Sequence, residues 1–178
     1  MSALRLCLLL ALVGSPALAQ APSAEAPPGH RFTLYTRSGL GLYLSEARTV
    51  GGVGGGFGVR DTLDGRFLLQ ADASYLMGLG NVLEVRLGAG IQRRGTYTPA
   101  ALLLVSGLMG DQLRFLSPGH PSPVHGPTLA LGMQLAPVRF THQGMQLSVL
   151  EFGVGVGSDL PGAGVALHLG LLEVGCVF

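Results

Sequence analysis

Seven charged residues occur at positions that a two-residue alternation places on one face of a series of β-strands. Opposite charges enclosed together can form ion pairs, and pairing offsets part of the free-energy cost of removing each charge from water. We therefore predict an interior charge network. Two interpretations stay open, a network that fills the interior, which we favour, and one that lines a narrow gated pore. The residues are Arg37, Arg60, Asp72, Glu84, Arg86, Glu151 and Glu173.

Histidine and serine side chains offer a second kind of chemistry. His120 and His125 share one segment with Ser122, and a histidine can activate a serine for acyl transfer. Pro121 lies between His120 and Ser122, and no acidic residue lies close to them in the sequence, so enzymatic activity is the less favoured interpretation. His168 is predicted to face outward with no serine beside it. Metal binding by His120 and His125 is weaker still, and we expect no metal.

Glycine-rich runs could suggest a nucleotide-binding loop. The runs GGVGGGFG and GVGVG both lack the GxGxxG spacing, and neither opens a predicted helix. Glycine at alternate positions instead predicts a strand face with small side chains, which leaves room for Arg and Tyr side chains to cross an interior. We therefore expect no cofactor. The net charge of +1 gives no electrostatic argument for nucleic-acid binding.

The composition restricts the class of protein. The chain has 178 residues, of which 48% are hydrophobic and 12% are charged, and all eleven basic residues are arginine. A typical soluble domain carries about 25% charged residues. After residue 20 there is no run of about 20 apolar residues, so no transmembrane helix is predicted. A closed β-barrel is the other structure that satisfies the backbone in lipid.

Apolar and polar residues alternate with the two-residue period of a β-strand. Asp64-Gly65 predicts one hairpin turn, and Gly78-Leu79-Gly80-Asn81 predicts the next. In the segment Met145–Gly157 the polar positions change parity, which a β-bulge near Leu150 would explain. The predicted strands span 32–44, 50–60, 67–77, 82–92, 99–109, 128–135, 145–157 and 164–178.

These strands predict a topology. Most are near the roughly 9–11 residues that cross a bilayer at a tilt. An even count places both chain ends in the periplasm and the long proline-rich link 111–126 outside the cell, with the shorter links 62–65, 94–97 and 137–144 on the periplasmic side. Five aromatic residues then fall at one rim, as in a membrane-interface girdle: Phe32, Phe67, Tyr97, Phe140 and Phe178.

The first residues predict export. Arg5 precedes the apolar segment 6–13, and Ala17-Leu18-Ala19 has the small-x-small pattern of a signal-peptide cleavage site. We predict a signal peptide at 1–19 that is cleaved after Ala19, a disordered linker rich in alanine and proline at 20–31, and a barrel at 32–178.

The final segment, LLEVGCVF, ends in Phe178 and places Val174 and Cys176 on the same face. It resembles the C-terminal signature of outer-membrane proteins, although Cys176 replaces the usual aromatic or aliphatic residue. With the strand count, the chain resembles the small OmpA-type and OmpX-type barrels. That resemblance implies an all-β, eight-stranded antiparallel up-and-down transmembrane barrel in the outer membrane of a two-membraned bacterium, with its lumen plugged by internal salt bridges. A soluble secreted barrel is the alternative.

The resemblance also implies partners and a role. Outer-membrane lipid and lipopolysaccharide would surround a monomeric barrel, and periplasmic chaperones and the barrel-assembly machinery would deliver it. We expect a structural or surface-interaction role. The alternatives are a narrow passive channel and a lipid A-modifying enzyme of the deacylase or acyltransferase kind, because such enzymes are also eight-stranded barrels.

Overall fold

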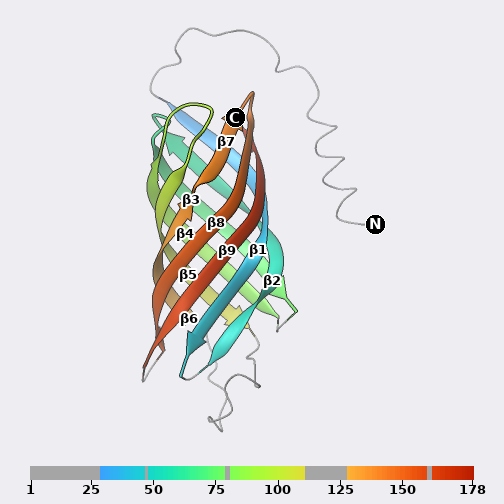
Figure 1. Ribbon diagram of the computed structural model, residues 1–178, viewed down its shortest axis with the longest axis vertical. Coiled ribbons are helices and arrows are strands. Elements are labelled where there is room, and N and C mark those ends of the chain that lie inside the picture. The colour runs from blue at the N-terminus through green and yellow to red at the C-terminus, as the bar shows by residue number, and fades with distance from the viewer. Residues whose placement is uncertain (1–28, 47, 79–80, 111–127, 160–161) are drawn as a thin grey trace, which may run out of the picture.

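The strands of the computed structural model wind into one closed barrel (Figure 1). The structure describes residues 29–46, 48–78, 81–110, 128–159 and 162–178. Within them, no helix has the length and apolar character needed to cross a membrane. The strands are β1 (His30–Ser45), β2 (Thr49–Leu63), β3 (Phe67–Met77), β4 (Val82–Gln92), β5 (Ala100–Gly110), β6 (Thr128–Ala136), β7 (Val138–His142), β8 (Met145–Asp159) and β9 (Gly162–Val177).

The barrel closes because β1 pairs with β2 on one side and with β9 on the other. All pairs are antiparallel, and both β6 and β7 pair with β8. The pairing of β7 with β8 continues the register of β6 with β8 without a shift. The strands β6 and β7 therefore occupy a single position in the wall, one after the other. The predicted eight-stranded, antiparallel, up-and-down barrel is therefore confirmed.

Side chains alternate between the two faces of the wall. In β3, Leu69 and Tyr75 are about half exposed on the outside, whereas Gln70 and Asp72 are buried inside. The same pattern holds around the ring, with large apolar side chains outside and most polar ones inside. This distribution is inverted relative to a water-soluble barrel, whose apolar side chains would fill the interior.

At three neighbouring positions in the wall, the alternation between inward and outward side chains shifts by one residue. Leu150 in β8 has a φ of 57°, and the pairing of β8 with β9 passes over it. Leu171 in β9 is the extra residue where the register with β1 shifts between Ser38 and Gly39. Pro137 separates β6 from β7. We call Pro137, Leu150 and Leu171 the bulge row, and the bulge predicted near Leu150 is confirmed.

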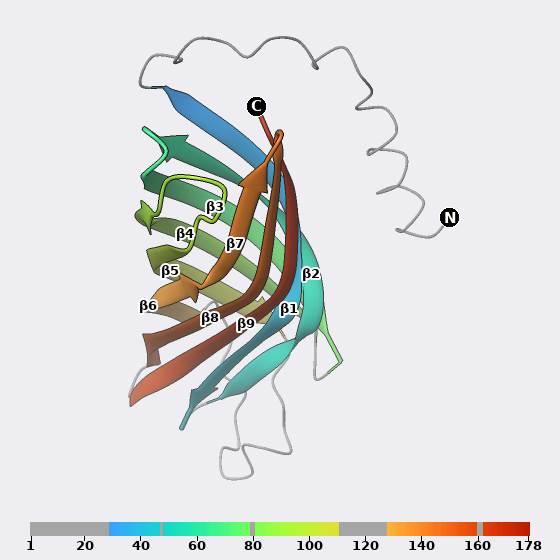
Figure 2. The same ribbon diagram turned by 45° about the horizontal axis from the view of Figure 1, so that its top comes forward.

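The segment 137–144 was predicted to be a link, but most of it is strand. Pro137 interrupts the wall because it has no N–H to donate, and β7 continues beyond it (Figure 2). The turn is Gln143-Gly144, with φ angles of 47° and 77°. Next to β7, the link between β4 and β5 extends the sheet, because Tyr97 forms a bridge with Phe140.

The barrel has two rims. The terminal rim holds the start of β1 at His30, the end of β9 at Val177 and the turn at Asp64-Gly65; the far rim is the opposite one. Both turn residues have positive φ, 53° and 63°, as the predicted hairpin requires. The five predicted girdle aromatics all lie exposed near the terminal rim.

Some of the predicted segments lie partly or wholly outside the residues that the structure describes. The predicted signal peptide and most of the linker lie outside the described residues, as does the link 111–126. The strand β1 begins at His30, two residues before the predicted barrel boundary. Such differences at strand ends are small and leave the topology unchanged.

Candidate functional site

The lumen holds all seven charged residues that the sequence placed inside. Each is at most 9% exposed, and they come from β1, β2, β3, β4, β8 and β9. Because of the bulge row, Glu151 and Glu173 lie on the inner face, and so do Gln146 and Ser148 on the other side of Leu150 in β8. The lumen is therefore filled by side chains from many strands, and the partners of each charge decide what it can do.

Arg60 and Glu173 form the most completely bonded pair. Two guanidinium nitrogens, Nη1 and Nη2, donate to Glu173 Oε1 and Oε2 at 2.8 and 2.9 Å. Arg60 also donates to Gln70 Oε1 through Nε and Nη2, at 3.1 and 2.8 Å, and to Gln146 Oε1. The guanidinium carbon lies 4.5 Å from the centre of the Tyr35 ring. Such a two-pronged Arg–carboxylate pair has a fixed geometry as well as a favourable charge interaction.

Asp72 accepts hydrogen bonds from several neighbouring strands. Tyr35 Oη and Gln70 Nε2 donate to its Oδ2 at 3.0 and 2.9 Å. Arg86 Nε and Arg37 Nη1 approach its Oδ1 at 2.8 and 3.3 Å. The carboxylate is thus shared by two guanidinium groups, which compensates its removal from water.

Glu151 lies at the centre of a third group, next to the bulge row. Arg139 Nη2 and Ser148 Oγ donate to Glu151 Oε1 at 2.7 and 2.8 Å. Gln134 Nε2 donates to Oε2 at 2.6 Å, and the Oε1 of that glutamine accepts from Arg86 Nη1 at 3.1 Å. Gln134 therefore joins the Glu151 group to the Asp72 group.

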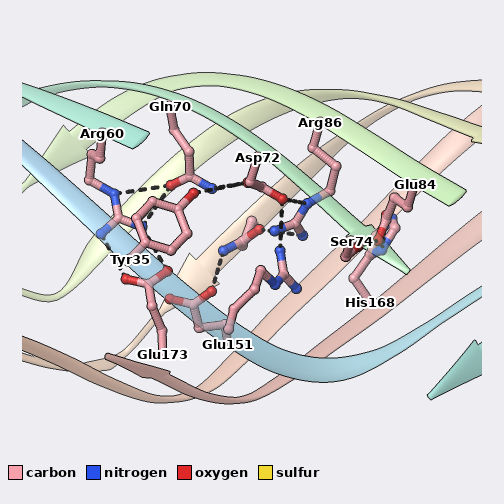
Figure 3. A network of polar contacts seen from close by, with 12 residues as sticks. Tyr35, Arg60, Gln70, Asp72, Ser74, Glu84, Arg86, Glu151, His168 and Glu173 are labelled. Atoms are coloured by element: carbon pink, nitrogen blue, oxygen red, sulfur yellow. Dashed lines mark hydrogen bonds and ion pairs between the residues drawn. The ribbon is translucent and has the colours of Figure 1, made fainter. Parts of the chain in front are cut away.

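These contacts form one continuous chain across the lumen (Figure 3). It involves β9, β2, β3, β4, β6, β8 and β7, so nearly every part of the wall contributes. Three guanidinium groups of this chain, those of Arg60, Arg86 and Arg139, balance its three carboxylates in charge, and Arg37 also approaches Asp72. The chain runs through Glu173, Arg60, Gln70, Asp72, Arg86, Gln134, Glu151 and Arg139.

His168 was predicted to face outward, and this prediction is wrong. The side chain faces the lumen and is only 8% exposed. Its Nδ1 lies 2.9 Å from Glu84 Oε1, although not along a hydrogen-bonding direction. Counting back by twos from Phe178 places it outside, but the extra residue at Leu171 reverses the parity. Ser74 Oγ donates to Glu84 Oε2 at 3.1 Å.

The Ser74, Glu84 and His168 group is not arranged for nucleophilic catalysis. A serine nucleophile needs a base in contact with its hydroxyl, whereas here Ser74 donates to the carboxylate that the imidazole also approaches. All three side chains are buried. The alternative pair, His120 and Ser122, lies outside the described residues.

Glycines on the inner face make room for two tyrosines. A Cβ at Gly58 would come within 2.5 Å of the Tyr35 ring, and a Cβ at Gly164 within 2.3 Å of the Tyr43 ring. Only glycine leaves these rings their place across the lumen. The prediction that inner glycines accommodate large side chains is confirmed at these positions.

Apolar side chains are buried in the lumen toward both rims. Toward the terminal rim they are Leu68, Ala100, Leu102, Leu104 and Ala136. Toward the far rim, the buried residues form an apolar cluster, which we call the apolar plug: Tyr43, Val50, Leu76, Val82, Leu108, Ala130 and Ala166. At the terminal rim, the lumen opens into a polar cup of about 590 Å³, lined by residues that include Thr33, Thr62, Thr98 and Gln146. Gln146 also bonds to Arg60, so the charge network forms the floor of this cup.

The described residues contain no group of three or more His, Cys, Asp or Glu side chains that could hold a metal ion. No protein-family model matches the chain, and no curated protein sequence matches it. Solved structures do match. Neisserial surface protein A aligns over 84% of this chain and 99% of its own, with a TM-score of 0.56 and 11% identity. The chain has the fold of the small outer-membrane β-barrels.

A second solved structure supports the same fold. Ail, the attachment invasion locus protein of Yersinia pestis, was solved in complex with the heparin analogue sucrose octasulfate. It aligns over 84% of this chain and 99% of its own, with a TM-score of 0.53 and 14% identity. At this level of identity the comparison establishes the shared outer-membrane-barrel fold and not a shared ligand.

The last strand of this outer-membrane-type barrel places its three predicted signal residues together. Val174, Cys176 and Phe178 all lie on the outer face. Phe178 N donates to Phe32 O at 2.8 Å, and Phe32 N donates to Phe178 O at 3.3 Å. The final residue thus pairs with the first strand where the ring closes. Recognition of these residues by assembly machinery stays a prediction.

Several polar residues of the network were not predicted from the sequence. Arg139 was assigned to a link because Pro137 precedes it. Gln70, Gln134 and Gln146 were visible as polar residues in apolar strands, but an uncharged amide gave no reason to prefer them as members. Their alternation with apolar neighbours was the signal that could have identified them.

Proposed function

We propose that this protein is a closed barrel of the outer membrane that acts through its cell-surface segments and neither conducts solutes nor carries out catalysis. The observation that carries this proposal is the continuous charge network from Glu173 to Arg139, which spans the lumen with balanced charge. A pore lined by charges would leave them facing water, whereas these are bonded to one another.

Insertion in lipid is supported by the outer face. Side chains such as Phe57, Leu103, Leu131 and Val156 are each more than half exposed, and exposed apolar patches of this extent are rare on soluble proteins. Lipid contact on that face removes these groups from water. We place the terminal rim in the periplasm, where its exposed aromatic residues would lie at the membrane interface.

A surface-interaction role is supported by the position of the longest connection. β5 ends and β6 begins at the far rim, so the segment between them leaves the barrel on the side opposite the chain ends. With the terminal rim in the periplasm, that segment is presented outside the cell. Two solved proteins of this fold are described as a surface protein and as an attachment invasion locus protein.

Membrane insertion is tested by fractionating cells that express the full chain. We expect the mature protein in the detergent-extracted outer-membrane fraction. Release by osmotic shock without detergent would instead indicate a soluble periplasmic barrel. A known periplasmic protein and a known barrel serve as controls in the same preparation.

The closed lumen is tested in planar lipid bilayers with the purified protein. We expect no stepwise conductance from the wild-type chain, and none from the Glu84→Gln or Arg86→Gln variants, because other network members and the apolar plug stay in place. Conductance that changes with either substitution would support the narrow-channel alternative.

The enzyme alternative is tested by the mass of lipid A on overexpression, which we expect to be unchanged. A new lipid A species that is lost in His120→Ala or Ser122→Ala would support the enzyme alternative.

A further inference from the structure

Three exposed arginines gather on one side of the terminal rim, on the turn between β2 and β3 and on the link between β4 and β5. They are Arg66, Arg93 and Arg94. The two segments are in contact, because Gln92 N donates to Arg66 O at 2.7 Å and Arg94 Nε donates to Asp64 O at 2.8 Å. These contacts bring the three exposed arginines to neighbouring positions of the rim, and we call them the arginine cluster.

Within the described part of the chain, no carboxylate neutralises the arginine cluster. None of the three arginines forms an ion pair with a carboxylate of the described residues. The Arg66 guanidinium carbon lies 6.0 Å from the centre of the Phe67 ring, which is on the outer face. This places a positive charge at the border between the outer apolar face and the rim.

An apolar groove begins directly below this border. It has a volume of about 560 Å³ and is lined by side chains that include Leu69, Ala71, Leu87, Ala89 and Leu103. The small side chains of Ala71 and Ala89 face outward next to the larger Leu87 and Leu69, with which they pair across β3 and β4. Phe67 and Ile91 form the next outward pair along the same two strands, between the groove and the arginine cluster.

We propose that the arginine cluster and the groove together form a binding site for an anionic phospholipid of the leaflet at the terminal rim. The phosphate contacts Arg66 and Arg93, Arg94 adds positive charge, and one acyl chain lies over Ala71 and Ala89. Guanidinium groups match phosphate in charge and geometry, and the groove matches an apolar chain. This inference rests on the proposed insertion in a membrane.

The order of the two features favours a lipid over other occupants. A phospholipid presents its anionic group and its apolar chain end to end, as the arginine cluster and the groove do. A second copy of this barrel would bring its own arginine cluster or its neutral wall to this place, and a free phosphate would use the arginines alone. Both alternatives are outcomes of the test.

The chain contains no tryptophan, so one introduced tryptophan can report the local lipid. We would place it in the groove by Leu87→Trp and, as a matched control, on the outer face of β8 by Phe152→Trp. The neighbours of β8 on either side of Phe152, β6 and β9, carry none of the three arginines. Each protein is reconstituted in phosphatidylcholine vesicles with a minor fraction of lipid that carries a brominated acyl chain, which quenches tryptophan fluorescence on contact.

We expect brominated phosphatidylglycerol to quench the Leu87→Trp reporter more than brominated phosphatidylcholine of the same chain length. Each arginine near a membrane surface contributes roughly a five-fold preference for anionic lipid at low salt. The preference should fall in Arg66→Gln/Arg93→Gln to no more than the contribution of Arg94 alone, and it should weaken in Ala71→Leu, which fills the groove. It should also weaken in high salt.

Four results would overturn the site. They are equal quenching by the two lipids, an equal phosphatidylglycerol preference at the Phe152→Trp reporter, retention of the full preference in Arg66→Gln/Arg93→Gln, and its loss when millimolar inorganic phosphate is added. A dimer that shields the Leu87→Trp reporter from both lipids would assign the groove to a second copy instead. If brominated phosphatidylcholine quenches neither reporter, the barrel is not in the bilayer, and the proposed function fails together with this site.

Discussion

Leu150 of β8 faces Leu171 of β9, and the ladder between the two strands passes over both residues while its register stays the same on either side. Both side chains lie on the outer face. Each strand thereby has one extra residue on the outer face, and the inner face gains Glu151 on one strand and Glu173 on the other. The bulge row is thus the local backbone feature that supplies the lumen with two of its carboxylates.

The backbone at Leu150 should make this position unusually tolerant of glycine. A left-handed conformation costs a residue with a side chain roughly 1–2 kcal/mol, and glycine avoids that cost. We expect Leu150→Gly to lower the free energy of unfolding by about 1 kcal/mol less than Leu147→Gly, which removes a similarly exposed leucine from the same strand. Urea unfolding in lipid vesicles measures both, and equal losses would contradict the strain argument.

The Arg60–Glu173 pair should show strong coupling. Glu173→Leu leaves the buried guanidinium without its carboxylate, and removing one partner of a buried pair costs about 3–5 kcal/mol of unfolding free energy. The double variant Arg60→Met/Glu173→Leu should lose less than the sum of the single variants. Additive losses in the same unfolding experiment would show that the two side chains do not interact as the structure indicates. Asp61→Asn, which breaks an exposed contact with His30, is the control and should change stability little.

The apolar plug and the charge network should block the lumen independently. Arg60→Ala/Glu173→Ala empties part of the network, yet the plug remains, so we expect no conductance in planar bilayers. Adding Tyr43→Ala and Leu108→Ala removes large side chains from the plug and should produce measurable ion current. A current from the network variant alone would mean that the plug is no barrier. If the combined variant carries no ion current, the barrier lies elsewhere in the lumen.

Cys176 should distinguish a lipid-covered face from a water-covered one. Its side chain is exposed on the outer face of β9, and the thiolate that reacts with maleimides forms poorly in an apolar environment. In vesicles, we expect a charged maleimide to label Cys176 much more slowly than a membrane-soluble one. Thr96→Cys, in the exposed link at the terminal rim, should react with both reagents. Rapid labelling of Cys176 by the charged reagent would contradict burial in lipid.

The sequence predicted the wall of this barrel well because its alternation is marked by polar residues and its turns by glycine, asparagine and aspartate. The strands Phe67–Met77 and Val82–Gln92 have the predicted bounds. The bulge at Leu150 was detectable because Ser148 and Glu151 demand opposite parities. At Leu171 the doubled outward residue is another leucine, so no polar side chain marked the change.

Two errors at the site follow from these local ambiguities. His168 lies beyond the unmarked bulge at Leu171, and its parity was therefore assigned backwards. Arg139 follows Pro137, a residue that commonly ends a strand, so the short strand β7 was not expected. The hydrogen-bond partners within the lumen depend on which strands face one another across it. Alternation along a single strand shows which face a side chain is on, but not which side chains it meets.

The ion pairs of the lumen bear on how the barrel folds. Arg60 of β2 meets Glu173 of β9, and Glu84 of β4 meets His168 of the same last strand. Neither β2 nor β4 is hydrogen-bonded to β9, so an open sheet that lacks the β1–β9 ladder cannot form these contacts. Their free energy becomes available only when the ring closes. An incomplete barrel keeps the ion pairs between adjacent strands, such as Asp72–Arg86 and Arg139–Glu151. It lacks the contacts that reach β9 from β2 and β4, so these contacts favour the closed ring over an open sheet.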